Sequence, residues 1–261
     1  MNRLQSEVCR LYLPRARAGQ DGACDEPGLI DADGKVRAMV LELSRPADWE
    51  SISKVWQGVQ VDLDLPAPAI AVSGVDGYQL WFSLSAPVPA AQAIAFLDAL
   101  RLRYLGEVKP QCIGLMPTVD AASPLQVLHA RRVPAPQAHS GHWSAFVAPD
   151  LAPVFAEEPW LDIPPNPDGQ ANLLARLVSI PPADFDLALE RLRPAAAAVQ
   201  SVTASSAAQA AVAGMGAMPA RPALQGEWLD PKRFLLDVMN SDAVDLHLRI
   251  EAAKALLPHI G

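Results

Sequence analysis

Two short apolar segments, residues 68–73 and 78–84, are joined by the tetrapeptide Gly74-Val75-Asp76-Gly77. Of all features of the sequence, this link constrains the fold most strongly. Glycines at both ends of a four-residue link between apolar runs are typical of a tight turn between paired strands. The sequence therefore predicts a β-hairpin here. Another strand is predicted at 36–43, a short apolar run that contains β-branched residues. We expect all three strands in one sheet, because their apolar patterns require a common buried side.

One helix is predicted before the hairpin in the chain and another after it. Pro46 suits the first turn of a helix that ends near residue 60, with Ser44 as its candidate cap. Pro89 opens a second helix whose apolar side extends to Tyr104. The order β-α-β-β-α predicts an α+β domain, with an open, mainly antiparallel sheet and helices packed on one face.

The rest of the predicted domain, which spans residues 1–193, is less regular. A short strand or helix is predicted at 8–13. Further candidate strands lie at 112–116, 125–128 and 142–147, and short helices at 170–177 and 184–192.

Two segments of different composition follow the predicted domain. Residues 194–226 hold 13 alanines and a single charged residue, Arg221, and predict a flexible linker. Residues 227–261 begin with the helix-start pair Asp230-Pro231 and continue with apolar residues at helical spacing, which predicts a helical hairpin. Such a hairpin is too small to be stable alone, so we expect it to dock on the main domain or on a protein partner.

Charge and composition limit the classes of function. The net charge of −8 and the pI near 5.1 argue against indiscriminate binding to nucleic-acid backbones, so any such contact must be local. The chain has no uninterrupted apolar run long enough for a transmembrane helix, which predicts no membrane contact. A start without the basic-then-apolar order of a secretion signal, and three cysteines without metal-site spacing, predict a reduced, cytoplasmic protein.

Residues 39–44 (MVLELS) and 71–82 (AVSGVDGYQLWF) resemble the core of archaeo-eukaryotic primase-like domains, in particular primase-polymerases of mobile elements and of bacterial end-joining ligases. In that family an apolar strand ends in an acidic-x-acidic pair that holds divalent metal. A later Ser-Gly-x-x-Gly-x-His-hydrophobic segment forms a hairpin whose serine and histidine contact nucleotide phosphates. The resemblance covers residues 39–84 and implies a primase-palm-like fold.

The resemblance implies roles for particular residues and also shows departures. Glu42 stands at the first metal position, but Ser44 stands at the second, and Gln79 replaces the histidine. Asp120 is the candidate for a later acidic position. Two-metal chemistry with Mg²⁺ or Mn²⁺ needs several carboxylates, so we expect the polymerase reaction to be lost.

Phosphate binding is compatible with that loss. Ser73, the turn from Gly74 to Gly77 and the Gln79 side chain are candidate hydrogen-bond donors to a phosphate. Arg131 and Arg132 form the most basic local patch and are further candidates. The alternative is structural: a tight turn that needs glycine, Gln79 facing solvent, and arginines in ordinary surface pairs.

Other chemistry-bearing residues have simpler explanations in the sequence. Asp62 and Asp64 are spaced to share a cation, but they lie between a helix and a strand, where a solvated connection is favoured. His139 and His142 are interpreted as loop residues. The aromatic residues with core periodicity are expected to pack rather than to stack on bases: Trp49, Trp56, Trp81 and Phe82.

The sequence is compatible with three functions. The favoured one is a non-catalytic protein that associates with a nucleotide or with single-stranded nucleic acid, derived from a primase-polymerase of mobile-element or phage context. The alternative is a protein-interaction adaptor that docks through residues 227–261. An active nucleotidyltransferase requires Glu42 to converge with Asp62, Asp64 or Asp120.

Overall fold

The computed structural model describes residues 2–14, 28–119 and 127–193. The predicted linker at 194–226 and helical hairpin at 227–261 lie outside the described residues, and so does Asp120.

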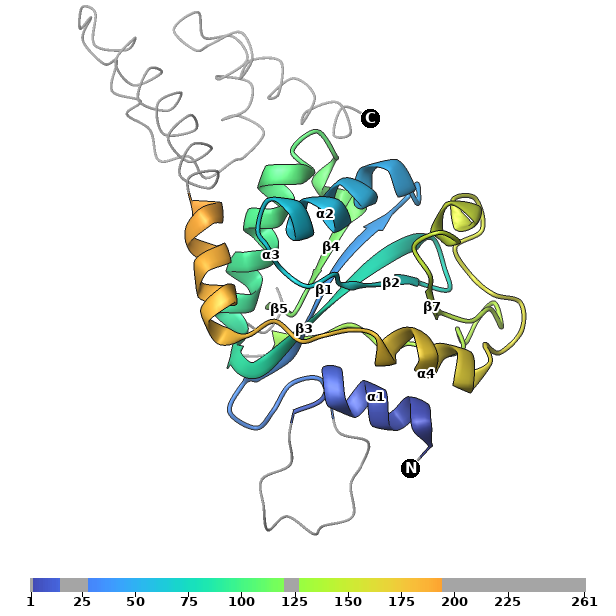
Figure 1. The fold of residues 1–261 in the computed structure, drawn as a ribbon. Helices are drawn as coiled ribbons and strands as arrows, with labels where there is room; N and C mark the ends of the chain where they lie inside the picture. Colours follow the sequence, from blue (N-terminus) through green and yellow to red (C-terminus); the bar gives the residue numbers. More distant parts are fainter. Residues whose placement is uncertain (1, 15–27, 120–126, 194–261) are drawn as a thin grey trace, which may run out of the picture. The chain divides into compact units, whose positions relative to one another are not determined.

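A five-stranded antiparallel sheet forms the centre of the domain, in the order β4-β1-β3-β2-β7 (Figure 1). Its strands are β1 (Lys35–Ser44), β2 (Ala69–Val72), β3 (Gly77–Pro89), β4 (Ile113–Met116) and β7 (Ala145–Val147). A separate two-stranded sheet pairs β5 (Thr118–Val119) with β6 (Val127–Leu128). The predicted strand at 36–43 and the predicted hairpin are confirmed in one sheet, with β3 between β1 and β2. The mainly antiparallel α+β class is confirmed as well.

Helices cover both faces of the sheet (Figure 1). The two helices of the predicted β-α-β-β-α order share one face, as predicted, and helices outside that order cover the other face. One face packs against α2 (Trp49–Val61), α3 (Ala90–Tyr104) and a helix over 182–193. The other packs against α1 (Arg3–Leu11) and α4 (Pro167–Ala175). Two short 3₁₀ helices, Pro110–Cys112 and Ala152–Phe155, complete the described elements.

The alternation of β1 explains why both faces need cover. Met39 and Leu41 join the core under α2 and α3, whereas Ala38 and Val40 join the core under α1. All four side chains are almost completely buried. A strand that is apolar on both faces is stable only between two layers.

The start of α2 differs from the prediction. Ser44 is the last residue of β1 and lies opposite Gly77 in the register, so it does not cap the helix. Asp48 occupies the N-cap position, and the helix begins at Trp49, three residues after Pro46. Strand pairing holds Ser44 in an extended conformation, and this pairing outweighs the local helix-start signal.

No helix among the described residues combines the length and the apolar character needed to cross a membrane.

Candidate functional site

A row of polar side chains crosses β1 and β3 on the face that α1 and α4 cover. Glu42 and Gln79 are direct partners in the antiparallel register. The Gln79 Nε2 donates to Glu42 Oε2 at 2.7 Å, and the Trp81 Nε1 donates to Gln79 Oε1 at 2.9 Å. Because the indole is only a donor, it fixes which end of the Gln79 amide faces the glutamate. The row thus has one defined orientation, with the carboxylate at its end.

The environment of Glu42 raises the pKa of its carboxyl group above the ordinary value. Burial is the largest cause, the hydrogen bond from Gln79 opposes it, and the charge of Asp76 adds to it. Arg45 opposes the increase, and its Nε lies 3.6 Å from Asp76 Oδ2. The carboxylate is therefore costly to ionise, although two neighbours favour its charge.

Gln79 does not face solvent, so the alternative prediction that it does is wrong. Its exposed fraction is 8%, and both ends of its amide are bonded within the protein. The prediction that Trp81 and Phe82 are core residues is confirmed, because both are buried.

The turn beside this row is held by its own serine. Ser73 Oγ accepts hydrogen bonds from the backbone N–H groups of Val75, Asp76 and Gly77, at 3.0–3.2 Å. The N–H of Gly74 donates to the Pro159 carbonyl at 3.0 Å. All four amides proposed as phosphate donors thus already have acceptors in the protein, and phosphate would have to compete with them.

Close contacts explain why both end positions of the turn are glycine. A Cβ on Gly77 would lie 2.7 Å from the Leu43 carbonyl oxygen, because β1 passes close to this point. Gly74 has a φ of +80°, and a Cβ there would lie 2.7 Å from the Ser144 nitrogen. The turn therefore needs glycine at both positions whether or not it binds a ligand.

Arg131 belongs to the same end of the sheet as the turn. Its Nη1 donates to Gln137 Oε1 at 3.3 Å, and the Gln137 Nε2 donates to the Ser73 carbonyl at 2.9 Å. The Arg131 side chain is exposed at the rim. Arg132 instead lines a cavity of about 280 Å³ with α1. The structure therefore brings Arg131, Ser73 and Gly74 together and places Arg132 toward another element.

The described residues do not fit a two-metal centre. They contain no group of three or more His, Cys, Asp or Glu side chains that would hold a metal ion. Asp62 receives hydrogen bonds from Tyr104 Oη at 3.0 Å and from Arg103 Nη2 at 3.3 Å, in the helical layer on the face opposite Glu42. Glu42 and Asp62 therefore cannot share a cation. Asp64 has a φ of +58° in the loop that follows α2.

His129, next to the arginine pair, has a structural partner. Its Nδ1 accepts from the Ala130 N–H at 2.8 Å, so its Nε2 carries the proton and donates to the Ala38 carbonyl at 3.0 Å. Burial lowers the pKa of this imidazole. His129 is thus a neutral hydrogen-bond donor to β1.

Sequence reasoning missed two features of this end of the sheet. The first is Gln137, a lone glutamine in a proline-rich loop, which has no distinguishing pattern in the sequence. The second is a stacked pair, His142 and Trp160, whose ring centroids are 4.7 Å apart with an interplanar angle of 4°. The two residues come from separate loops, so no periodicity relates them.

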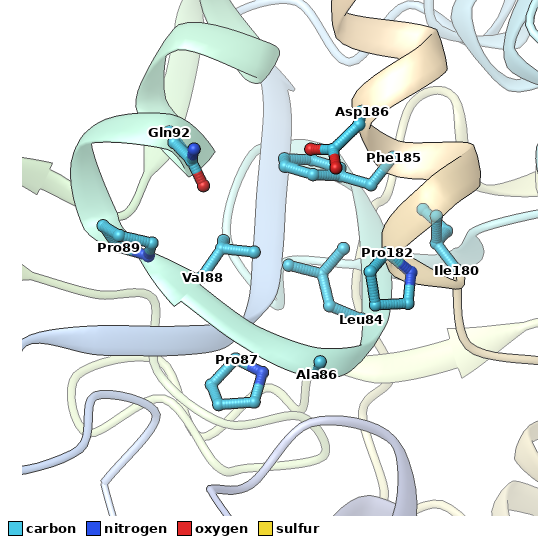
Figure 2. A pocket seen from close by; sticks show the side chains of 10 residues that line it. All are labelled: Leu84, Ala86, Pro87, Val88, Pro89, Gln92, Ile180, Pro182, Phe185 and Asp186. Carbon is cyan, nitrogen blue, oxygen red and sulfur yellow. The ribbon is translucent and has the colours of Figure 1, made fainter.

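A second cavity lies between the C-terminal half of β3 and the helix over 182–193 (Figure 2). Its volume is about 270 Å³, and aliphatic, proline and phenylalanine side chains form most of its wall, with Gln92 and Asp186 as the polar groups. It holds no predicted site residue.

No protein-family model matches the chain, and no curated protein matches it. The primase-like resemblance stays a prediction that rests on residues 39–84.

Proposed function

We propose that this domain binds single-stranded nucleic acid or a nucleotide at the end of the sheet that carries Glu42, Gln79 and the Ser73 turn, and that it does not transfer nucleotides. In this proposal the domain derives from a primase-polymerase of mobile-element or phage context. The observation that supports it best is the hydrogen bond from Gln79 to Glu42. The two residues that the resemblance aligns with a metal ligand and a phosphate ligand face each other in the register.

The charges at this end of the sheet suit a local phosphate contact. Arg45 and Arg131 are exposed, and each is held near the turn, Arg45 by Asp76 and Arg131 by Gln137. An arginine held by a neutral amide keeps its full positive charge for an anion. Arg131 is therefore the first candidate for the phosphate contact.

The carboxylates argue against catalysis in this proposal. Two-metal phosphoryl transfer requires several acidic ligands around the cations. Glu42 has Gln79 and Ser44 as its polar neighbours in the sheet, and Asp76 faces Arg45. An amide and a hydroxyl do not replace the missing negative charges.

A titration with labelled oligothymidylate and with nucleoside triphosphates, with and without Mg²⁺ or Mn²⁺, tests binding. Arg131→Glu should weaken binding, whereas Arg191→Glu makes the same charge change on the helix of the opposite face and should not. Absence of binding by the unmodified chain refutes the proposal.

Primer extension by the pure protein tests the second part of the proposal, that the domain does not transfer nucleotides. We expect no incorporation with either metal. Metal-dependent incorporation that Glu42→Ala abolishes would show that the site is catalytic and that the proposal is wrong.

A further inference from the structure

The stacked pair of His142 and Trp160 is an unusual aromatic feature in this domain. Neither ring belongs to the two hydrophobic clusters that form the core, unlike Trp81 and Phe82. The His142 side chain is 32% exposed, and Trp160 is half-buried. The pair is therefore an ordered aromatic surface that solvent reaches.

Two backbone hydrogen bonds connect this pair to the turn. The Pro159 carbonyl, one residue before Trp160, accepts from the Gly74 N–H at 3.0 Å. The His142 carbonyl accepts from the Gln137 N–H at 2.7 Å, and Gln137 also holds Arg131. The aromatic pair and the exposed guanidinium thus lie around the same turn and are fixed by the same short segments.

We propose that the His142–Trp160 pair is a stacking platform for a base of single-stranded nucleic acid, whose adjacent phosphate faces Arg131. This inference rests on the proposed function and names the part of the ligand that the aromatic pair contacts. Every base presents a flat π-face, so a planar aromatic surface binds bases with little dependence on sequence. An arginine at the edge of such a surface supplies the phosphate contact that unpaired strands need.

The charges around the pair define the expected mode of binding. Asp162 lies 3.8 Å from His142 Nε2, and the neighbouring Glu157 and Glu158 are exposed. These carboxylates disfavour a long phosphate track, so we expect stacking to dominate and the affinity to depend only weakly on salt. They also define the main rival ligand, a methylated lysine, which aromatic rings and acidic groups bind by cation–π attraction.

Variants at Trp160 test the platform with the full chain and labelled oligothymidylate. Trp160→Leu removes the aromatic face and should weaken binding about 5- to 150-fold, the range for loss of one stacked base. Trp160→Phe keeps an aromatic face and should retain most of the affinity. His142→Ala removes the ring that orients Trp160 and should weaken binding, whereas His139→Ala, an exposed histidine in the same loop, should not.

An abasic deoxyribose-phosphate oligomer of equal length separates stacking from phosphate contact. We expect it to bind the unmodified chain as weakly as oligothymidylate binds Trp160→Leu. Thermal melts of each variant check the fold. If Trp160→Leu does not fold, His142→Ala takes its place in this comparison: oligothymidylate should bind His142→Ala about as weakly as the abasic oligomer binds the unmodified chain.

The outcomes distinguish this inference from the proposed function. Oligothymidylate binding that Arg131→Glu weakens but Trp160→Leu leaves unchanged would overturn the stacking platform alone. Binding of a nucleoside triphosphate without binding of oligothymidylate would also overturn the stacking platform alone. No binding of either ligand would overturn both. Binding of a trimethyllysine peptide that depends on Trp160, without oligonucleotide binding, would identify the pair as a cation site and would also overturn the inference.

Discussion

Gln79 donates a 2.7 Å hydrogen bond to Glu42 across β1 and β3, with its amide orientation fixed by the indole of Trp81. The glutamate is half-buried beside this neutral donor, and the described residues place no cluster of three or more potential metal ligands around it. Partial burial raises the pKa of this carboxyl group, so its ionised form is an electrostatic cost to the folded state.

Glu42→Gln should stabilise the fold at high pH. Burial raises the pKa of Glu42, so the folded state binds a proton more tightly than the unfolded state, and the contribution of this group to stability is lost as the pH rises through its folded pKa. The variant cannot ionise and its carbonyl still accepts from Gln79. Urea unfolding should show the variant to be more stable than the parent well above the ordinary glutamate pKa of 4.5, with the difference shrinking below it.

Glu107→Gln serves as the control for this pH series, because Glu107 is exposed beyond α3. Its effect on unfolding should not change sign or grow with pH. A parent protein that gains stability over Glu42→Gln as the pH rises would contradict the electrostatic account of Glu42.

The strands and helices around this site follow from local patterns in the sequence, but the pairing of Glu42 with Gln79 does not. The short apolar runs of β1 and β3 predict strands, and the 74–77 turn predicts that β2 and β3 are neighbours. β1 and β3, in contrast, are separated in the chain by α2 and β2, and their register is set by packing on both faces of the sheet. A polar residue within an apolar strand therefore indicates a site, but the sequence does not show which residue of a neighbouring strand pairs with it.

The helix and loops that cover this face of the sheet show the same limit. The short helix α1 carries apolar residues at helical spacing, Leu4, Val8 and Leu11, which pack against the core of this face. This stripe predicts that the helix docks, but it does not show on which face of the sheet. The His142–Trp160 pair depends on how two proline-containing loops meet. Contacts of this kind depend on tertiary structure and leave no periodic signal in the chain.

Gly77→Ala should destabilise the domain because β1 leaves no room for a methyl group. The new Cβ would lie 2.7 Å from the Leu43 carbonyl oxygen and 2.8 Å from Ser44 Cβ. We expect a loss of about 1–3 kcal/mol in the free energy of unfolding, the range for overpacked sites. Gly169→Ala is the matched control: it lies within α4 with only a distant contact, at 3.9 Å, and should stabilise by about 0.5–1 kcal/mol. Equal effects of the two substitutions would contradict the close approach at Gly77.

Ser73→Ala should destabilise the turn because one hydroxyl oxygen accepts three amides. Without it the N–H groups of Val75, Asp76 and Gly77 lose their acceptor. We expect a cost of about 1–3 kcal/mol in chemical denaturation, the usual penalty for unsatisfied polar groups. Ser53→Ala, which removes an exposed hydroxyl on α2, should change stability by less than about 0.5 kcal/mol. If Ser73→Ala is as mild as Ser53→Ala, solvent satisfies the amides and the turn does not depend on its serine.

Arg37→Met should loosen the attachment of α1 to the sheet. The Arg37 side chain is 2% exposed and donates to the carbonyls of Arg10 and Leu13, at 2.9 and 2.8 Å, and to that of Leu84 at 3.0 Å. Methionine fills similar space but donates nothing, so these buried carbonyls lose a charged donor, at a cost of about 2–5 kcal/mol in the free energy of unfolding.

Arg3→Met is the control for Arg37→Met, because Arg3 is exposed on α1 and arginine and methionine have similar helix propensities. It should change the free energy of unfolding by less than about 0.5 kcal/mol. Hydrogen exchange adds a local measurement: in Arg37→Met the amides of α1 should exchange faster by a larger factor than those of β2, which Arg37 does not contact through these bonds. Uniform acceleration over both elements would mean that Arg37 supports the whole fold rather than the docking of α1.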